Sequence, residues 1–516
     1  RGQKEAVLCV TPFFQFEPKG EDLKENKTFS RQAQKITDGK YDLFFETNGE
    51  VEDLPEKKET YFYRYDECDG RRENGTASAV YQTKKRVKPG EETDLTVIYS
   101  LDSWIDVEVK SLFDKMKEEQ IHHEEKLIKT SGLKNELAKT LVRSADKFLS
   151  KRESTKGLTI LAGFPFFEDW GRDTMIALPG ICISTGRFDS AKSIMRTFAF
   201  YEKDGLMPNL FPEGGNKPLY NTVDAALLFI NCAWLYYEKT QEIEFAEEMY
   251  PVMQKIISGY ENGTHFNIHM EEDGLISAGT GLDQVTWMDV RVGEILPTPR
   301  HGKPVEINAY WYNALCIMQK FSEILKRTEA QEYRKLACKV KESFVREFWM
   351  EENQCLKDVI SETKADMQIR CNQIWAVSMP FTMLDEEKER QIVDMVFEKL
   401  YTPYGLRTLE PKDEEFHASY GGEMIKRDLA YHQGTVWTFP MGGYYLAYLK
   451  VNKNSKEAKK TVAKQMEVLE SAMREGCIGQ LPEIYDGEIP VSSKGCFAQA
   501  WSVGEILRVY EKLEEE

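Results

Sequence analysis

The segment WGRDT at 170–174 places an ion pair beside aromatic side chains. Arg172 and Asp173 are adjacent, and Trp170 follows the aromatic run FPFF at 164–167. Asp173 could simply cap a helix that begins there, with Arg172 as its ion-pair partner. Aromatic faces beside a charged pair also suit a sugar ring, which stacks on the aromatic face and needs directional donors and acceptors for its hydroxyls. The segment therefore indicates either a helix start or a carbohydrate-binding corner.

Two further carboxyl groups lie in loops where they could act as an acid and a base. Asp289 ends TWMD at 286–289, and a carboxyl packed against indole has its charged form disfavoured, which raises its pKa and suits a general acid. Glu483 follows a proline in PEIYDG at 482–487, well before the next expected helix, so it has no obvious capping role. A glutamate there could activate water at neutral pH. The alternatives are a turn aspartate and an exposed loop glutamate.

The segment YHQGTVW at 431–437 adds polar side chains near an expected buried helix. His432 is either a hydrogen-bonded core histidine or a contact for a substrate hydroxyl, and Gln433 lies beside it. With seven histidines and no HExxH pair, we expect no metal site. The sequence also lacks GxGxxG, GxxxxGK[ST] and GxSxG segments, which argues against dinucleotide, P-loop and serine-hydrolase chemistry. No cofactor is therefore expected.

Composition limits the class of protein and its partners. The 516 residues carry a formal net charge of −18 from 68 basic and 86 acidic residues, and such a field repels phosphate backbones, so we expect no nucleic-acid partner. No run of 18 apolar residues is present, so we expect no membrane span. The ten cysteines form no CxxC pair, which argues against a zinc ribbon or a redox site, and several lie inside apolar helical patterns, which favours reduced thiols and a cytoplasmic location. The oligomeric state does not follow from these features.

The elements that must position the candidate residues fall into three regions. Residues 151–516 form the predicted helical domain that carries all of the candidates, and residues 109–150 are highly charged and helical, as a linker would be. Residues 1–108 begin abruptly, which predicts a small or truncated β-rich domain. Its expected strands are VLCVTPFFQF, YDLFFETN, TYFYRYD, SAVYQTKKRVKP and TDLTVIYSL.

Helical patterns follow one another from residue 133 onward, in two alternating kinds. One kind has Lys and Glu along one face, and the other is rich in Ala, Gly, Leu and Trp and poor in charge. Six buried helices that alternate with six amphipathic ones predict a mainly α fold, an (α/α)6 toroid; a helical solenoid is the alternative, but no repeat of 20–50 residues recurs. The expected helices are 133–152, 173–187, 188–203, 220–239, 243–262, 304–327, 329–350, 368–380, 384–400, 428–450, 455–475 and 498–514.

Long loops precede the buried helices, whereas the loops before the amphipathic helices are short. These long loops contain the aromatic and carboxylate side chains, so we expect them to gather on one rim of the ring, where loops on a rigid scaffold carry function. The loops are FPFFEDWGRD, DGLMPNLFPEGGNKPLYNT, DGLISAGTGLDQVTWMD and GCIGQLPEIYDG.

Taken together, several segments resemble the amylo-α-1,6-glucosidase domain of glycogen-debranching enzymes. These segments occur in the same order as in that family, from about residue 163 to 511. The first and last pairs of segments are also similar to those of glucoamylases, which are six-hairpin glycosidases with the same toroid. Residues 1–108 are only loosely similar to that family. The matching segments are EDWGRDTMIALPG, DGLMPNLFPEG, YNTVDAALLFI, TWMDV, PTPRHGKPVEINAYWYNAL, YGLRTL, YHQGTVW, LPEIYDG and FAQAWSVGEILR.

The resemblance implies an inverting glycoside hydrolase that removes the single α-1,6-linked glucose stub of a branched α-glucan or limit dextrin during glycogen degradation. Asp289 becomes the general acid and Glu483 the general base, which must stand about 6.5–9.5 Å apart. No 4-α-glucanotransferase domain is expected before residue 150. The residues implied to hold the glucose are Trp170, Arg172, Asp173, Asn209, Asp224, Trp287, Glu306, Asn308, His432, Gln433 and Trp437.

Three alternatives to this reading have distinct requirements. A glucoamylase-like exo-glucosidase would cleave α-1,4 as well as α-1,6 bonds with the same pair of carboxyl groups. An inverting glycoside phosphorylase would use phosphate in place of water, which makes Glu483 dispensable and predicts a cationic pocket. A non-catalytic glucan-binding module would need the aromatic side chains but neither carboxylate.

Overall fold

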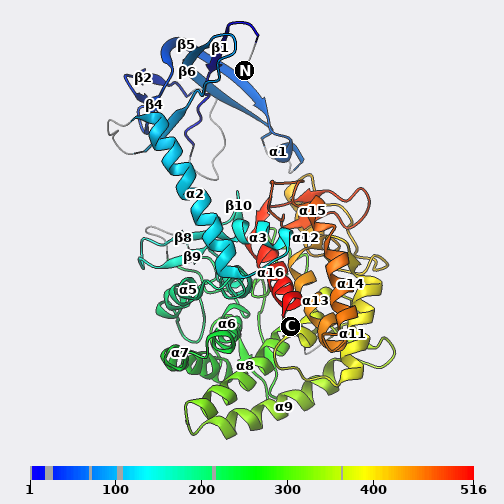
Figure 1. Ribbon diagram of the computed structural model, residues 1–516. Helices are drawn as coiled ribbons and strands as arrows, with labels where there is room; N and C mark the ends of the chain where they lie inside the picture. Colours follow the sequence, from blue (N-terminus) through cyan, green and yellow to red (C-terminus); the bar gives the residue numbers. More distant parts are fainter. Residues whose placement is uncertain are drawn as a thin grey trace. The chain divides into compact units, whose positions relative to one another are not determined.

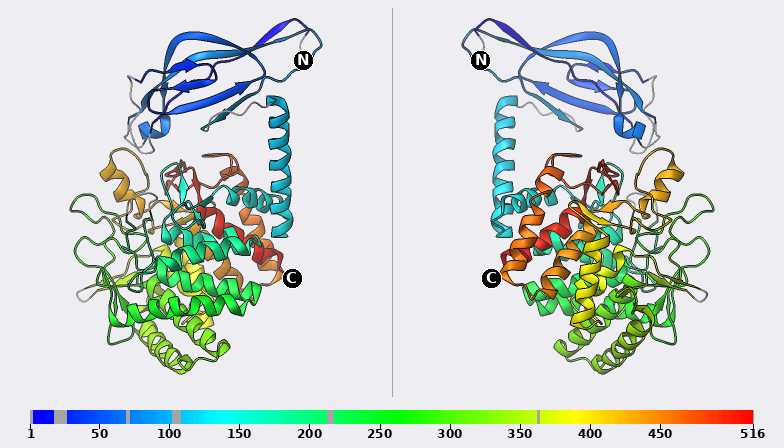
Figure 2. Two further views of the ribbon diagram at one scale, coloured as in Figure 1. Left: turned by 90° about the vertical axis from the view of Figure 1, so that its left-hand side faces the viewer. Right: turned by 90° about the vertical axis from the view of Figure 1, so that its right-hand side faces the viewer.

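The computed structural model describes residues 3–17, 27–68, 72–101, 108–211, 217–361 and 364–515. Most of the regular structure is α-helical, as the sequence predicts. The chain divides into two compact units, one formed by the chain up to Lys126 with Gly421–Glu423 and the other by the remainder. Figures 1 and 2 colour the strands of the first unit blue and the helices of the second from cyan to red.

The first unit contains two antiparallel sheets. One has the strand order β1-β6-β5 and the other β2-β3-β4-β7. Their side chains share a small core in which Phe45 of β4 stacks on Tyr81 of β6, with ring centroids 4.3 Å apart. The elements are β1 (Ala6–Val10), β2 (Ser30–Gln32), β3 (Lys35–Thr37), β4 (Asp42–Thr47), β5 (Glu50–Phe62), α1 (Arg64–Cys68), β6 (Asn74–Val87) and β7 (Val97–Ser100).

Strand β5 departs from the strand expected over TYFYRYD. It begins ten residues earlier, at Glu50, and it ends at Phe62, where α1 follows after one residue. The early part was missed because EVEDLPEKKE is charged and has no alternation, and nearly every residue of the strand is exposed. The pairing with β6 shifts register between Asp53 and Lys57, around Pro55, as expected for a proline within a strand.

The segment between the strands and the main helical array is also helical. Helix α2 (Val109–Ser131) is followed by α3 (Glu136–Asp146), which Asn135 caps by accepting from two backbone N–H groups of its first turn. Leu127 and Leu133 already belong to the core of the second unit. The expected helix 133–152 ends early, at Asp146, and the chain continues as the hairpin β8 (Leu149–Lys151) and β9 (Leu158–Ile160).

Six predominantly buried helical segments form the centre of the second unit. Each contacts the next in chain order, α4 to α6, α6 to α8, α8 to α10, α10 to α13 and α13 to α16, and α16 contacts α4. Their interior is the main hydrophobic core. The segments are α4 (Gly171–Leu178) with a π turn (Pro179–Ile183), α6 (Ala225–Thr240), α8 (Val305–Ile324), α10 (Trp375–Ser378) after a 3-10 turn (Cys371–Ile374), α13 (Phe439–Val451) and α16 (Ala500–Glu514).

Amphipathic helices alternate with these segments along the chain and pack against them. Each contacts at least one neighbouring buried segment, for example α9 against α8 and α14 against α13. Charged side chains on their outer faces explain why the sequence pattern located them well. They are α3, α5 (Phe188–Phe200), α7 (Ile243–Asn262), α9 (Ala330–Phe348), α11 (Glu386–Lys399) and α14 (Lys456–Met466), and the short α15 (Leu469–Ala472) follows the last.

Glycines allow some of the buried helices to approach closely. A Cβ on Gly180 would lie 1.7 Å from the carbonyl oxygen of Gly504, and a Cβ on Gly504 would lie 2.7 Å from that of Ala177. No side chain fits at either position, so the backbone after α4 and that of α16 are in direct contact. This contact joins the last buried helix to the first.

The expected helix 428–450 is wrong as a single element. Helix α12 (Met424–Tyr431) ends at YHQG, the short strand β20 (Val436–Trp437) follows, and only then does α13 begin. Gly434 has a φ of +146°, and a Cβ there would lie 2.4 Å from the carbonyl oxygen of His417. A continuous helix cannot contain that backbone conformation, so the motif forms a turn and a strand instead.

Short strands organise the loops of the second unit. The largest group has the order β18-β19-β20-β21-β22, and a smaller one has the order β13-β16-β17. None of the helices in the described ranges is long and apolar enough to cross a membrane. The strands are β10 (Gly163–Phe164), β11 (His269–Met270), β12 (Ile276–Ser277), β13 (Lys303–Pro304), β14 (Trp349–Met350), β15 (Cys355–Leu356), β16 (Val359–Ile360), β17 (Ala365–Asp366), β18 (Tyr401–Thr402), β19 (Gly405–Arg407), β21 (Ile484–Tyr485), β22 (Ser493–Lys494) and β23 (Ala498–Gln499).

Candidate active site

Arg172 lies in the first turn of α4 and is buried among acceptors. Its Nε donates to Oδ2 of Asp224 at 2.6 Å, and one terminal nitrogen donates to Thr222 Oγ1 and to the carbonyl oxygen of Val285. Asp224 immediately precedes α6, so this ion pair ties the starts of two buried helices together. Burial opposes the charge on Arg172, but Asp224, Asp173 and Asp289 together raise its pKa.

Asp173 is the next residue of the same helical turn, and it also is buried. It makes no side-chain cap to α4; its Oδ1 accepts a weak hydrogen bond from Gln499 at 3.4 Å. Burial raises the pKa of Asp173 to about 7, because the nearby negative charge of Glu483 adds to the desolvation and outweighs Arg172. The segment WGRDT does start a helix, but Asp173 is not its N-cap, because Trp170 occupies that position and makes no side-chain cap.

Asp289 lies in the loop that precedes β13, and its two carboxyl oxygens have different surroundings. Oδ2 accepts the backbone N–H groups of Val285 and Thr286, at 2.9 and 2.6 Å. Oδ1 is buried and has no hydrogen-bond partner among the residues that the structure describes. Burial raises the pKa of Asp289, although the two amides and the charges of Arg300 and His301 oppose this. A proton on Oδ1 would thus be available for transfer.

Val285 fixes the position of Asp289 relative to Arg172. Its carbonyl oxygen accepts from Arg172 and from the N–H of Val223, while its own N–H donates to Asp289. The backbone of this single residue therefore bonds to both the guanidinium of Arg172 and the carboxyl group of Asp289. The two side chains share a corner built from the starts of α4 and α6.

Glu483 lies immediately before β21, and donors hold both of its carboxyl oxygens. Oε1 accepts the hydroxyl of Tyr431, the last residue of α12, and Oε2 accepts the backbone N–H of Cys496 at 2.7 Å. Donors on both oxygens stabilise the ionised carboxylate. The side chain of Glu483 can occupy this position only because residue 495 is a glycine, since a Cβ on residue 495 would lie 2.3 Å from Oε2 of Glu483. With 2% of its surface exposed, Glu483 is not the exposed loop acid of the alternative reading.

An aromatic wall lies beside these carboxyl groups. Trp287, two residues before Asp289, makes edge-to-face contacts with His432, Trp437 and Phe439, at centroid distances of 5.1, 5.3 and 4.9 Å. His432 stacks on Trp437, with an angle of 20° between the rings. Trp437 in β20 pairs with Ile484 in β21, so strand register places the wall next to Glu483.

His432 presents polar atoms within this aromatic surface. It is 1% exposed, and neither ring nitrogen makes a hydrogen bond of good geometry with the described residues; its one polar interaction is a weak one with the backbone of Met288. Burial lowers the pKa of His432 well below its ordinary value, the positive charge of Arg370 adds to this, and the backbone of Met288 opposes it. His432 is therefore a neutral imidazole that can donate through one ring nitrogen and accept through the other.

Asn209 and Trp170 come together through the backbone at the start of α4. The N–H of Gly171 donates to the carbonyl oxygen of Asn209 at 2.7 Å, and Trp170 forms a bridge with Leu210. The Oδ1 atom of Asn209 is buried without a partner among the described residues, so it is a free acceptor. Trp170 is half-buried and makes an edge contact with Phe167.

Three of the predicted sugar-binding residues are engaged in the protein itself. Glu306 forms a fully buried, two-pronged ion pair with Arg300, which also holds Asp358. Asn308 uses its amide to bond the backbone of Ile276 and Pro304 at 2.8–3.1 Å. Gln433 accepts from Arg370 and donates to the carbonyl oxygen of Pro297. The geometry gives these three side chains structural roles.

The charge of this cluster is negative. Asp173, Asp224, Asp289 and Glu483 lie in this cluster with Arg172, which is bonded to Asp224, while Arg300, also within electrostatic reach of Asp289, is bonded to Glu306 and Asp358. Such a site favours a neutral polyhydroxylated ligand over an anion. Within the described ranges, no group of three or more His, Cys, Asp or Glu side chains is arranged to hold a metal ion.

Comparison with known proteins agrees with the motifs. Residues 143–508, more than half of the chain, match the amylo-alpha-1,6-glucosidase family. The chain belongs to this family. The glycogen debranching enzyme of Saccharomyces cerevisiae (strain ATCC 204508 / S288c) is 25% identical over 412 residues, a match that covers 60% of this chain and 26% of that protein. The chain thus spans about a quarter of the length of this relative.

Some residues of this member of the amylo-alpha-1,6-glucosidase family were missed by sequence reasoning. Tyr431 lies within the recognised segment YHQGTVW, but its partner Glu483 is 52 residues away, so no local pattern pairs them. Asn372, which accepts the indole N–H of Trp287 at 2.8 Å, is 85 residues from it. The only local signal for Tyr431 was its position beside His432.

Proposed function

We propose that this chain is an inverting glycoside hydrolase that removes a single α-1,6-linked glucose stub from a branched dextrin. Asp289 is the general acid and Glu483 the general base. The observation that carries this assignment is the contrast between the two carboxyl groups. Asp289 has one oxygen fixed by two amides and the other without a partner among the described residues, whereas both oxygens of Glu483 accept hydrogen bonds.

The reaction follows from the protonated state of Asp289 and the ionised state of Glu483. Asp289 donates the proton on Oδ1 to the glycosidic oxygen, and the bond from C1 of glucose to that oxygen breaks. A water molecule attacks C1 from the opposite face while Glu483 accepts its proton, so the products are β-glucose and a dextrin with a free 6-hydroxyl group. A proton then returns from Glu483 to Asp289 through solvent.

The terminal glucose would occupy the corner between the two carboxyl groups. The groups with unused hydrogen-bonding capacity there are the acceptor of Asn209, the imidazole of His432 and the weakly bonded carboxyl of Asp173. Trp170, Trp287 and Trp437 supply the apolar faces on which a sugar ring packs. Arg172 and Asp224 hold the framework of this corner through their mutual ion pair.

The fold that we propose for residues 151–516 is the (α/α)6 toroid, with residues 1–108 as a β-rich domain and 109–150 as a linker. Support comes from the cyclic order of contacts from α4 through α16 and back to α4, and from the amphipathic helix that precedes each of the buried segments along the chain. The candidate carboxyl groups lie in or just before the starts of buried helices or in the loops that lead to them.

The electrostatics of the site favour water over phosphate as the nucleophile. A phosphorylase must bind an anion next to C1, but here Arg172 is bonded to Asp224, Arg300 is bonded to Glu306 and Asp358, and Glu483 adds negative charge beside Asp173. A buried phosphate would find no unpaired cation among these groups and would be repelled by the ionised Glu483. The name of the yeast relative, a glycogen debranching enzyme, supports a branched α-glucan as the substrate.

One assay tests the proposed function. The protein is incubated with a singly branched dextrin in phosphate-free buffer, and the released sugar is followed by ¹H NMR before mutarotation equilibrates it. We expect free glucose that appears first as the β anomer. Release of α-glucose, of glucose 1-phosphate only after phosphate is added, or of maltodextrins longer than one glucose would contradict the proposal.

A further inference from the structure

A buried network of polar side chains contacts the loop that carries Asp289. Arg300, Asp358 and Asn372 form this network, and at most 2% of the surface of each is exposed. They come from three segments: the loop before β13, the connection between β15 and β16, and the 3-10 turn before α10. Arg300 donates to both carboxyl oxygens of Asp358, at 2.8 and 3.2 Å, and Asn372 donates to one of them at 2.7 Å. The network therefore joins segments that are distant in the chain.

The guanidinium of Arg300 has five N–H groups, and each of them has an acceptor. Two bond to Asp358, two bond to Glu306, and the fifth donates to the hydroxyl of Thr286 at 3.3 Å. Two carboxylates thus account for four of the donors, and the remaining one is directed at the loop of Asp289. A buried charged donor that loses its acceptor is costly, so this bond holds Thr286 in place.

Thr286 links Arg300 to Asp289 through a single residue. Its hydroxyl accepts from Arg300, and its backbone N–H donates to Oδ2 of Asp289 at 2.6 Å. The same hydroxyl accepts the N–H of Met288 at 3.4 Å, inside the turn that leads to Asp289. A displacement of Thr286 would therefore displace an amide that holds the acid.

Asn372 is a second anchor for the same loop. Its Oδ1 accepts the indole N–H of Trp287 at 2.8 Å, and its amide nitrogen contacts Sδ of Met288 at 3.2 Å. Each residue from Thr286 to Met288 thus has a side-chain contact with the network. A loop fixed in this way gives Asp289 one orientation, in which Oδ1 has no partner among the described residues.

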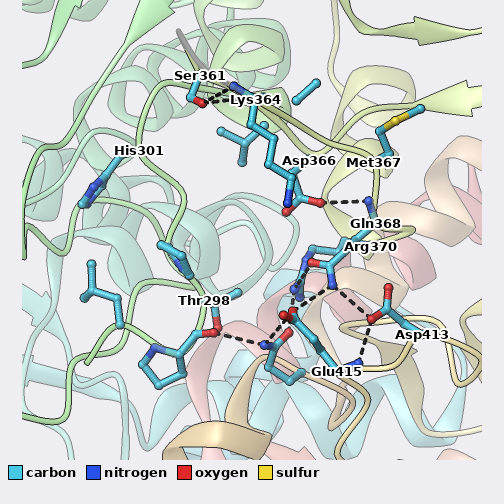
Figure 3. A pocket seen from close by; sticks show the side chains of 16 residues that line it. Thr298, His301, Ser361, Lys364, Asp366, Met367, Gln368, Arg370, Asp413 and Glu415 are labelled. Atoms are coloured by element: carbon cyan, nitrogen blue, oxygen red, sulfur yellow. Dashed lines mark hydrogen bonds between the residues drawn. The ribbon is translucent and has the colours of Figure 1, made fainter.

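The network borders a cavity of about 750 Å³ in the second unit, which Figure 3 shows. Arg370 lines this cavity, and its Nε lies 3.9 Å from Oδ2 of Asp358, too far for a hydrogen bond. The terminal nitrogens of Arg370 bond instead to Gln368 and Gln433. A change at Asp358 would thus disturb both the network and the cavity wall, so Thr286 is the sharper position for a test.

The candidate base is held by different elements. Glu483 accepts from Tyr431 at the end of α12 and from the backbone N–H of Cys496, which follows β22. These two donors lie outside the network of Arg300. A change in the network should therefore alter the position of the acid and leave the base in place.

We propose that Thr286 is a positioning residue for the general acid. Anchored to Arg300 through its hydroxyl, it presents its N–H to Oδ2 of Asp289 and so directs the protonated Oδ1 toward the glycosidic oxygen. Proton transfer requires the acid within hydrogen-bond reach of that oxygen, so a displaced acid loses rate. The inference rests on the proposed function, and it adds Thr286 and Asn372 as the residues that set the geometry of the transfer.

The test compares Thr286→Val with Thr286→Ser in the full chain, on a singly branched dextrin and on α-glucosyl fluoride. Valine has the shape of threonine but no acceptor, so Thr286→Val should lower kcat/KM for the dextrin about tenfold, the effect of one lost hydrogen bond to a charged group. Hydrolysis of the fluoride should change little, because fluoride leaves without a proton. Thr286→Ser keeps the hydroxyl and should retain the wild-type ratio of dextrin to fluoride activity.

A matched control and a second variant separate positioning from stability. Thr185, just beyond the π turn that follows α4, is 2% exposed and donates to a backbone carbonyl oxygen at 2.6 Å. Thr185→Val should lower the melting temperature, but its ratio of dextrin to fluoride activity should equal that of the wild type. Asn372→Ala releases Trp287 and Met288 and should lower this ratio, as Thr286→Val does.

Asp289→Asn, assayed beside these variants, distinguishes this inference from the proposed function. If Asp289→Asn loses far more activity on the dextrin than on the fluoride, but Thr286→Val or Asn372→Ala leaves the ratio unchanged, the network does not position the acid. A Thr286→Ser variant as impaired as Thr286→Val would also contradict the inference, because the hydroxyl would not be the anchor. If Asp289→Asn lowers both activities equally, the assignment of the acid is itself wrong, and the inference fails with it.

Discussion

Tyr431 donates its phenolic hydrogen to Oε1 of Glu483, and this bond joins the end of α12 to the start of β21. The second oxygen of Glu483 is held by the backbone N–H of Cys496. A side-chain donor and a backbone donor therefore fix the plane of the carboxylate. The hydroxyl of Tyr431 acts through Glu483, which makes Tyr431 a positioning residue.

Tyr431→Phe should lower kcat about tenfold or more on dextrin and on α-glucosyl fluoride alike, since a hydrogen bond to a charged group contributes about 1.5–3 kcal/mol. The acidic limb of the pH–rate profile should also move to higher pH, because the carboxylate of Glu483 loses a donor that stabilises its ionised form. Tyr485→Phe is the matched control: its buried hydroxyl has no partner among the described residues, so kinetics should stay at the wild-type level. Equal behaviour of the two variants would contradict the role of Tyr431.

The raised pKa of Asp289 predicts the alkaline limb of activity. A general acid must be protonated, so kcat/KM for dextrin should fall as the pH rises through the pKa of Asp289, above the ordinary range of an aspartate. Fluoride leaves without protonation, and its profile should have a weaker alkaline limb. The two profiles are measured in one buffer series, and an alkaline limb of the same depth for both substrates would argue against Asp289 as the acid.

Asp173 makes stability depend on pH. Its pKa of about 7 in the folded state exceeds the ordinary value of 3.8, so the protonated form favours folding. Its contribution is fully present below pH 3.8 and is lost as the pH rises through 7, a difference of about 4 kcal/mol. Urea denaturation should show that Asp173→Asn gains stability relative to the wild type between pH 5 and pH 8. A constant difference across that interval would show that Asp173 is not buried as described.

Gly495 is required by the side chain that it faces. It has a φ of +65°, and a Cβ there would lie 2.3 Å from Oε2 of Glu483. Gly132, with a φ of +68° and nothing within 4 Å, provides the control. Gly495→Ala and Gly132→Ala should each lose about 1–2 kcal/mol of stability from the left-handed backbone, but only Gly495→Ala should lose kcat, at least tenfold. If Gly495→Ala keeps full activity, the orientation of Glu483 is not critical.

The helices were the part of the fold most accessible from sequence. The amphipathic helices α5, α7, α9 and α11 were predicted within a few residues, because a charged face and a buried face leave a clear period. The prediction for the segment 428–450 failed because the backbone at Gly434 packs against that of His417, a contact that the helical pattern of the segment does not reveal. Strand β5 failed because an exposed strand of charged residues has no pattern to detect.

The candidate site was accessible as a set of residue types but not as a set of contacts. The sequence indicated Asp289 and Glu483 as candidates, and the structure gives each a different hydrogen-bonding environment. The sequence also indicated Asn308, whose amide forms hydrogen bonds with the backbone of Ile276. Which polar side chains are used by the protein and which remain free is decided by residues far apart in the chain, as for Trp287 and Asn372.

The dependence of Asp289→Asn on the leaving group tests the account most directly. This variant and Glu483→Gln are assayed side by side on a singly branched dextrin and on α-glucosyl fluoride. Asp289→Asn should lose about 10²–10⁴ in kcat/KM on the dextrin and far less on the fluoride, because only the sugar leaving group needs a proton. Glu483→Gln should lose activity on both, because both need an activated water. Equal losses of Asp289→Asn on the two substrates, or near-wild-type hydrolysis of both by Glu483→Gln, would contradict the account.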